Sequence, residues 1–134
     1  MSVRKTGSVT DGTPHHRSSN PAVEKMWSTA IEAALAEPNV LDAALRLVVY
    51  NHQPLVRLAM GSTIDVPSVL DAVFDPADVA AAIVEATALL RDGYHYTYYP
   101  ERDASNVAEL AAAHPGFSLA SINCALMRGY EANR

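Results

Sequence analysis

The sequence predicts an all-α protein, a compact bundle of about five to six helices behind a flexible N-terminal tail. Alanine is abundant, whereas Phe and Trp together occupy only three positions, which favours helices packed through small side chains over a β-sandwich. Proline and capping residues mark helix starts, and apolar residues follow them at three- and four-residue spacing. With 134 residues, 49% of them hydrophobic and 19% charged, the chain can bury a core of its own.

The chain divides into a polar start and a helical remainder. We expect residues 1–19 to form a flexible tail, because they are rich in Gly, Ser, Thr and His and have no hydrophobic period. Residues 20–134 are then expected to form a single helical domain. His15 and His16 are adjacent on the tail, where a histidine pair makes no specific metal site.

The first helix is expected to begin with Asn20 as N-cap and Pro21 at the first helical position, and to end near Glu37 before Pro38. The apolar residues that follow Pro21 lie on one face of such a helix. A second helix over 39–51 should end before the proline at position 54.

In the middle of the chain, the sequence predicts two short helices and one long helix. The short helices are expected before Gly61 and after Asp65. The long helix has the clearest start, because Asp75 can cap it and Pro76 suits its first position. Gly93 is placed to end it.

Two further helices are predicted near the C-terminus, over about 104–113 and 118–131, with Ser118 as the cap of the second. Between the long helix and this pair, the composition of residues 94–100 departs from helix. These residues are expected to form a short aromatic segment, either extended or a loop.

The charge and cysteine content narrow the class of protein. The formal net charge is −5, and an acidic body repels phosphate backbones, so general nucleic-acid binding is disfavoured. A single cysteine, Cys124, rules out an intramolecular disulfide and a cysteine-based metal site. No signal peptide is recognisable at the start, and the longest apolar run, 79–90, is too short to span a bilayer. We therefore expect a cytoplasmic protein without membrane contact.

The aromatic segment is the first candidate for a binding surface. Tyrosine combines a flat apolar face with a hydrogen-bonding tip, which suits recognition surfaces and small-molecule pockets. A histidine near carboxylates could also support acid–base chemistry. The alternative interpretation is that the tyrosines only cap the helical core. The candidate binding residues are Tyr94, His95, Tyr96, Tyr98, Tyr99 and Arg102.

The C-terminal helix pair, residues 107–128, resembles a helix-turn-helix of the phage-repressor type. The positions that carry this resemblance are Ala112, Gly116, Phe117, Ile122 and Ala125. The resemblance implies a DNA-binding regulator, in which Asn123 and Arg128 are the candidate nucleic-acid contacts. The same residues also fit a plain αα-hairpin that completes the bundle.

These observations favour a small acidic helical protein that binds another protein and is not an enzyme, with self-association as a further alternative. The sequence contains no phosphate-binding glycine loop, nucleophile elbow or paired His-x-x-x-His, so no catalytic residue, metal or cofactor is assigned. Two other functions remain open. One is a DNA-binding transcriptional regulator that uses the 107–128 hairpin, and the other is an enzyme or small-ligand-binding protein with a Tyr/His pocket at 94–103.

Overall fold

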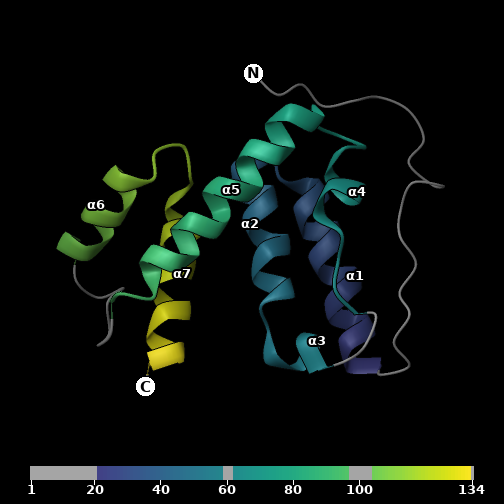
Figure 1. Ribbon diagram of the computed structural model, residues 1–134, viewed down its shortest axis with the longest axis horizontal. Coiled ribbons are helices and arrows are strands. Elements are labelled where there is room, and N and C mark those ends of the chain that lie inside the picture. The colour runs from purple at the N-terminus through teal and green to yellow at the C-terminus, as the bar shows by residue number, and fades with distance from the viewer. Residues whose placement is uncertain (1–20, 59–61, 97–103, 134) are drawn as a thin grey trace. The chain divides into compact units, whose positions relative to one another are not determined.

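The computed structural model describes residues 21–58, 62–96 and 104–133, and Figure 1 shows their path. These ranges contain seven α-helices and no strand, so the all-α prediction is confirmed. The predicted tail at 1–19 lies outside the described residues. Contacts divide the chain into two compact units, Met1–Ile83 and Val84–Arg134, and each unit is described by itself below.

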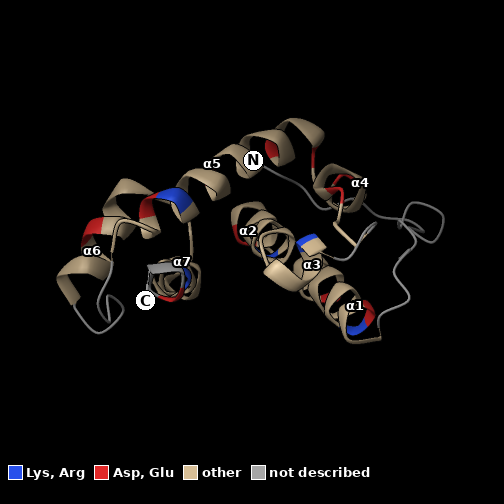
Figure 2. Cartoon of the chain, turned by 60° about the horizontal axis from the view of Figure 1, so that its bottom comes forward, with Lys and Arg blue, Asp and Glu red and all other residues tan. Residues whose placement is uncertain are grey.

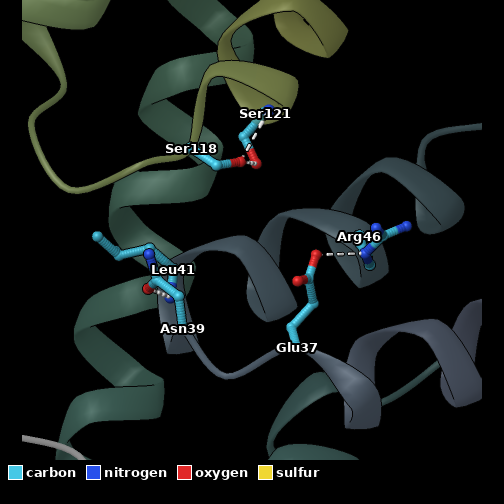
Figure 3. Close-up of polar contacts among 6 residues, drawn as sticks. All are labelled: Glu37, Asn39, Leu41, Arg46, Ser118 and Ser121. Atoms are coloured by element: carbon cyan, nitrogen blue, oxygen red, sulfur yellow. Dashed lines mark hydrogen bonds and ion pairs between the residues drawn. The ribbon is translucent and has the colours of Figure 1, made fainter.

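The first unit begins with α1 (Pro21–Ala36) and α2 (Val40–Asn51), which lie side by side (Figure 1). As predicted, Pro21 is the first residue of α1. The cap of α2 is Asn39, whose Oδ1 accepts a hydrogen bond of 2.9 Å from the Leu41 N–H (Figure 3). An ion pair of 2.7 Å between Arg46 Nε and Glu37 Oε2 spans the connection between the helices (Figure 3).

Helix α2 is the centre of the first unit, because α1, α3 (Pro54–Leu58) and α4 (Val66–Leu70) all contact it. Its side chains are buried around most of the helix. The buried residues of α2 are Asp42, Ala43, Ala44, Leu45, Leu47, Val48 and Tyr50.

Side chains at the end of α2 form hydrogen bonds with the backbone of the segment that precedes α4, and these bonds hold the segment in place. Asn51 Nδ2 donates to the Ile64 carbonyl at 2.8 Å, and the Ile64 N–H donates to Asn51 Oδ1 at 2.7 Å. Beside this pair, the buried Tyr50 hydroxyl donates to the Ser62 carbonyl at 2.7 Å. The side chains thus partner buried backbone groups that have no regular secondary structure of their own.

Helix α5 (Pro76–Gly93) crosses the boundary between the two units. Its start matches the prediction, since Asp75 Oδ1 accepts a hydrogen bond of 2.9 Å from the Ala77 N–H. Its end also lies at the predicted residue, Gly93. The reason for glycine there is packing, because Gly93 is not among the described glycines with a positive φ.

The second unit contains the end of α5, α6 (Ala104–Ala113) and α7 (Leu119–Asn133). The turn between α6 and α7 uses Gly116 at a φ of 99°, where a side chain would strain the backbone. The Ser118 hydroxyl then caps α7 by accepting from the Ser121 N–H at 3.2 Å (Figure 3).

The backbones of α5 and α7 approach closely through two glycines. A Cβ added at Gly129 would lie 2.0 Å from the Gly93 carbonyl oxygen, and one added at Gly93 would lie 2.5 Å from the Ala125 carbonyl oxygen. Neither position can hold a side chain unless the helices separate. Ile122, Ala125 and Leu126 of α7 are buried, whereas Leu119, at the start of the helix, is 63% exposed.

Within the described residues, none of the helices combines the length and the apolar character that crossing a lipid bilayer requires.

We expect Gly129→Ala to destabilise the protein even though alanine is the better helix former. Helix propensity alone predicts a gain of about 1 kcal/mol, whereas overpacking against a backbone carbonyl costs about 1–3 kcal/mol. Urea unfolding followed by circular dichroism measures the balance. The control is Val84→Ala, which raises helix propensity at an exposed position of α5. A higher unfolding midpoint for Gly129→Ala than for the wild type would contradict the close approach.

We expect Asn51→Ala to lower the free energy of unfolding by about 2–3 kcal/mol, because it leaves two partly buried backbone groups of Ile64 without a partner. Tyr50→Phe removes one hydrogen bond and should cost about 1 kcal/mol. Thr63→Ala, an exposed change between the two anchored residues, is the control. Equal stability of Asn51→Ala and Thr63→Ala would show that the hydrogen-bonded pair does not hold this segment.

Candidate binding site

The chain leaves α5 through a tight turn that places two predicted site residues beside the end of the helix. The His95 N–H donates to the Asp92 carbonyl at 3.1 Å, and the Tyr96 N–H donates to the Gly93 carbonyl at 3.2 Å. The described part of the aromatic segment is therefore a turn and not an extended strand. Residues 97–100 of that segment lie outside the described residues.

A hollow of about 360 Å³ opens between this turn and α6. Three of its lining residues come from α5 and the turn, and three from successive turns of α6. Figure 2 shows acidic residues both on the last turns of α5 and on α6. The lining residues are Asp92, His95, Tyr96, Glu109, Leu110 and Ala113.

Tyr96 and Glu109 form a hydrogen-bonded pair within the hollow. The phenol hydroxyl of Tyr96 donates to Glu109 Oε1 at 2.5 Å. This hydrogen bond, together with partial burial and the negative charges of Glu109 and Asp92, raises the pKa of Tyr96 to about 12. Tyr96 therefore holds its proton across the physiological range, and the pair presents one carboxylate charge.

Asp92, the other carboxylate of the hollow, is held by a histidine from outside the lining. His114 Nε2 lies 2.7 Å from Asp92 Oδ2, and the His114 side chain is only 6% exposed. Its second ring nitrogen, Nδ1, is buried and has no hydrogen-bond partner among the described residues. Because His114 is so deeply buried, it positions the Asp92 carboxylate and does not itself reach a ligand in the hollow.

The structure brings together only part of the predicted aromatic site. His95 and Tyr96 line the hollow, whereas Tyr94 is 37% exposed and is not among the lining residues. Tyr98, Tyr99 and Arg102 lie outside the described residues.

Sequence reasoning missed the four other lining residues. On α6, the spacing of Glu109, Leu110 and Ala113 puts them on one side of the helix, which helical periodicity could have shown. The sequence carries no comparable signal for Asp92, which is 17 positions before Glu109 in the chain. Only the packing of α6 beside the end of α5 brings the two carboxylates to one hollow.

The residues proposed for nucleic-acid contact both lie on α7. Asn123 is half-buried. Arg128 Nη1 is 3.7 Å from Glu131 Oε2, and its side chain is 26% exposed. A neighbouring carboxylate weakens the attraction of this arginine for a phosphate backbone. The helix, turn and helix of the predicted hairpin are present, and DNA binding by them stays a prediction.

Across residues 21–58, 62–96 and 104–133, no three His, Cys, Asp or Glu side chains are arranged to hold a metal ion. The hollow therefore offers hydrogen-bonding and charged groups without a preformed metal site.

Comparison of the chain with known protein families, with curated proteins and with solved structures gave no match.

We expect Glu109→Gln to lower the pKa of Tyr96 from about 12 towards the ordinary value of 10, because a neutral amide replaces the carboxylate that accepts the hydrogen bond of the phenol and places a negative charge beside it. The pKa of Tyr96 is higher in the folded protein than in the unfolded chain. The protonated phenol therefore stabilises the folded state below pH 10, and this contribution is lost as the pH rises towards 12. Absorbance at 295 nm during alkaline titration measures the change. Subtracting the titration of a Tyr96→Phe variant isolates the residue, because burial also raises the pKa of Tyr50 to about 12.

Glu85→Gln is the control for this titration, since Glu85 is an exposed residue of α5 that does not line the hollow. Identical Tyr96 titrations in wild type and Glu109→Gln would mean that the Glu109 carboxylate does not raise the pKa of Tyr96.

Proposed function

We propose that the chain is a small acidic, non-enzymatic protein that binds another protein, and that the hollow between the end of α5 and α6 is part of its binding surface. The observation that carries this proposal is the lining of the hollow, which combines titratable and aromatic side chains with two apolar residues, Leu110 and Ala113. Mixed polar and aromatic groups around an apolar centre are typical of protein interfaces.

The dimensions of the hollow favour a partner side chain over an enclosed small molecule. Its volume of about 360 Å³ is at the lower end of the range for small-molecule sites. Three of its six lining residues, His95, Glu109 and Ala113, are exposed, so a bound group would keep contact with solvent. Small-molecule sites instead cover most of the ligand with a predominantly apolar lining.

Exposed apolar side chains on α7 support a protein partner. Leu119 is 63% exposed and Met127 is 48% exposed, and their spacing of two helical turns puts them on one face. A second protein, or a second copy of this chain, would gain free energy by covering them. We place this interaction in the cytosol, a reducing compartment that suits a chain with a single cysteine and therefore no intramolecular disulfide.

A photoreactive residue, p-benzoylphenylalanine, introduced in place of Ala113 tests the proposal in the cells that make the protein. Ala113 lines the hollow and is exposed, so irradiation should join a partner to the protein and produce an adduct of higher mass. Mass spectrometry of the adduct identifies the partner, and an adduct of twice the chain mass identifies self-association.

The matched control carries the same photoreactive residue in place of Ala108, which is exposed on α6 but does not line the hollow. An adduct from position 113 that is absent from position 108 supports the proposed surface. No adduct from position 113, or equal adducts from both positions, would contradict it.

A further inference from the structure

We infer that the hollow binds a basic side chain, a lysine or an arginine, that the protein partner inserts between Asp92 and Glu109. The inference rests on the proposed function, and it adds the chemical class of the group that is recognised.

The first argument is charge. Among the described residues, the lining contains two carboxylates, Asp92 and Glu109, and neither lysine nor arginine. Tyr96 keeps its proton because of its hydrogen bond to Glu109, so it adds no charge of its own. Arg91 Nε lies 3.7 Å from Asp92 Oδ1, but the Arg91 side chain is 71% exposed and does not line the hollow. An incoming cation therefore finds two carboxylates at the hollow, whereas an anion would be repelled.

The second argument is shape and polarity. Ala113, which is exposed, and the small accessible part of Leu110, which is 2% exposed, supply a small apolar patch in the lining. Lysine and arginine have an apolar stem and a charged head, so they can cover such a patch while the head stays near charged groups and solvent. Tyr96 adds an aromatic ring, and rings beside carboxylates bind ammonium and guanidinium groups.

The third argument concerns how the carboxylates are held. His114, at 2.7 Å from Asp92, and Tyr96, at 2.5 Å from Glu109, each occupy one oxygen of a carboxylate. A carboxylate accepts hydrogen bonds on both oxygens, so each keeps further acceptor capacity for a partner's N–H groups. Side chains that are already oriented lose less conformational entropy when a ligand binds.

The test is a titration of the full chain with N-acetyl-lysine methylamide and N-acetyl-arginine methylamide, followed by NMR of the backbone amides. N-acetyl-norleucine methylamide is the neutral probe of matched shape. The basic probes should shift the amides of His95, Tyr96 and Ala113 with a dissociation constant of roughly 1 mM, as expected for so few atoms. They should bind about tenfold more tightly than the norleucine probe. Salt at 0.5 M should weaken the binding of the basic probes, because it screens the charge of the carboxylates.

Glu109→Gln keeps the size of the side chain and an oxygen acceptor for Tyr96 while it removes one charge. It should raise the dissociation constants of the basic probes about threefold, and leave the dissociation constant of the norleucine probe unchanged. Glu85→Gln removes the same charge from outside the hollow and should leave all probes unchanged. Equal binding of charged and neutral probes, equal effects of the two variants, or no shift at the hollow at all would overturn the inference.

The two proposals fail in different ways. Suppose that the photoreactive residue at position 113 yields a partner adduct, but the basic probes neither bind the hollow nor reduce the adduct. The proposal of a protein-binding surface is then supported, and the inference that it recognises a basic side chain is wrong. If the basic probes bind as expected and no adduct forms, the cation site stands and the protein interface is wrong.

Discussion

The close approach of α5 and α7 is the constraint on which the second unit depends. The backbone of Gly93 occupies the space where a Cβ of Gly129 would lie, so the two helices can meet only with glycine at both positions. This contact holds the last turn of α5, from which the chain turns to place His95 and Tyr96. The hollow follows from it, because the turn forms one wall and α6 forms the other.

The first unit is organised by polar groups within a largely apolar core. Helix α2 is buried around most of its surface, and its last residues hold the irregular segment at 62–64 through Tyr50 and Asn51. Buried backbone groups need hydrogen-bond partners, and an irregular segment cannot supply them from its own backbone. The two side chains therefore do here what a regular hydrogen-bonding pattern does inside a helix.

The candidate site uses positioning residues to hold the two carboxylates that line the hollow. Each carboxylate has a partner, His114 for Asp92 and Tyr96 for Glu109, and the partners differ in burial. His114 is almost fully buried and does not line the hollow, whereas Tyr96 is one of the lining residues. A surface of this kind is acidic and partly apolar, and hydrogen bonds from within the chain orient its carboxylates.

By itself, the sequence determined the helices, since the starts at Pro21, Asn39, Asp75 and Ser118 depend on caps and prolines that act within one turn. It also singled out His95 and Tyr96 through their unusual local composition. Tertiary structure alone decided that Gly93 serves close packing, that Leu119 is exposed and that Asp92 meets His114 and Glu109 at one hollow. Local rules extend over about one helical turn, whereas those contacts join residues far apart in the chain.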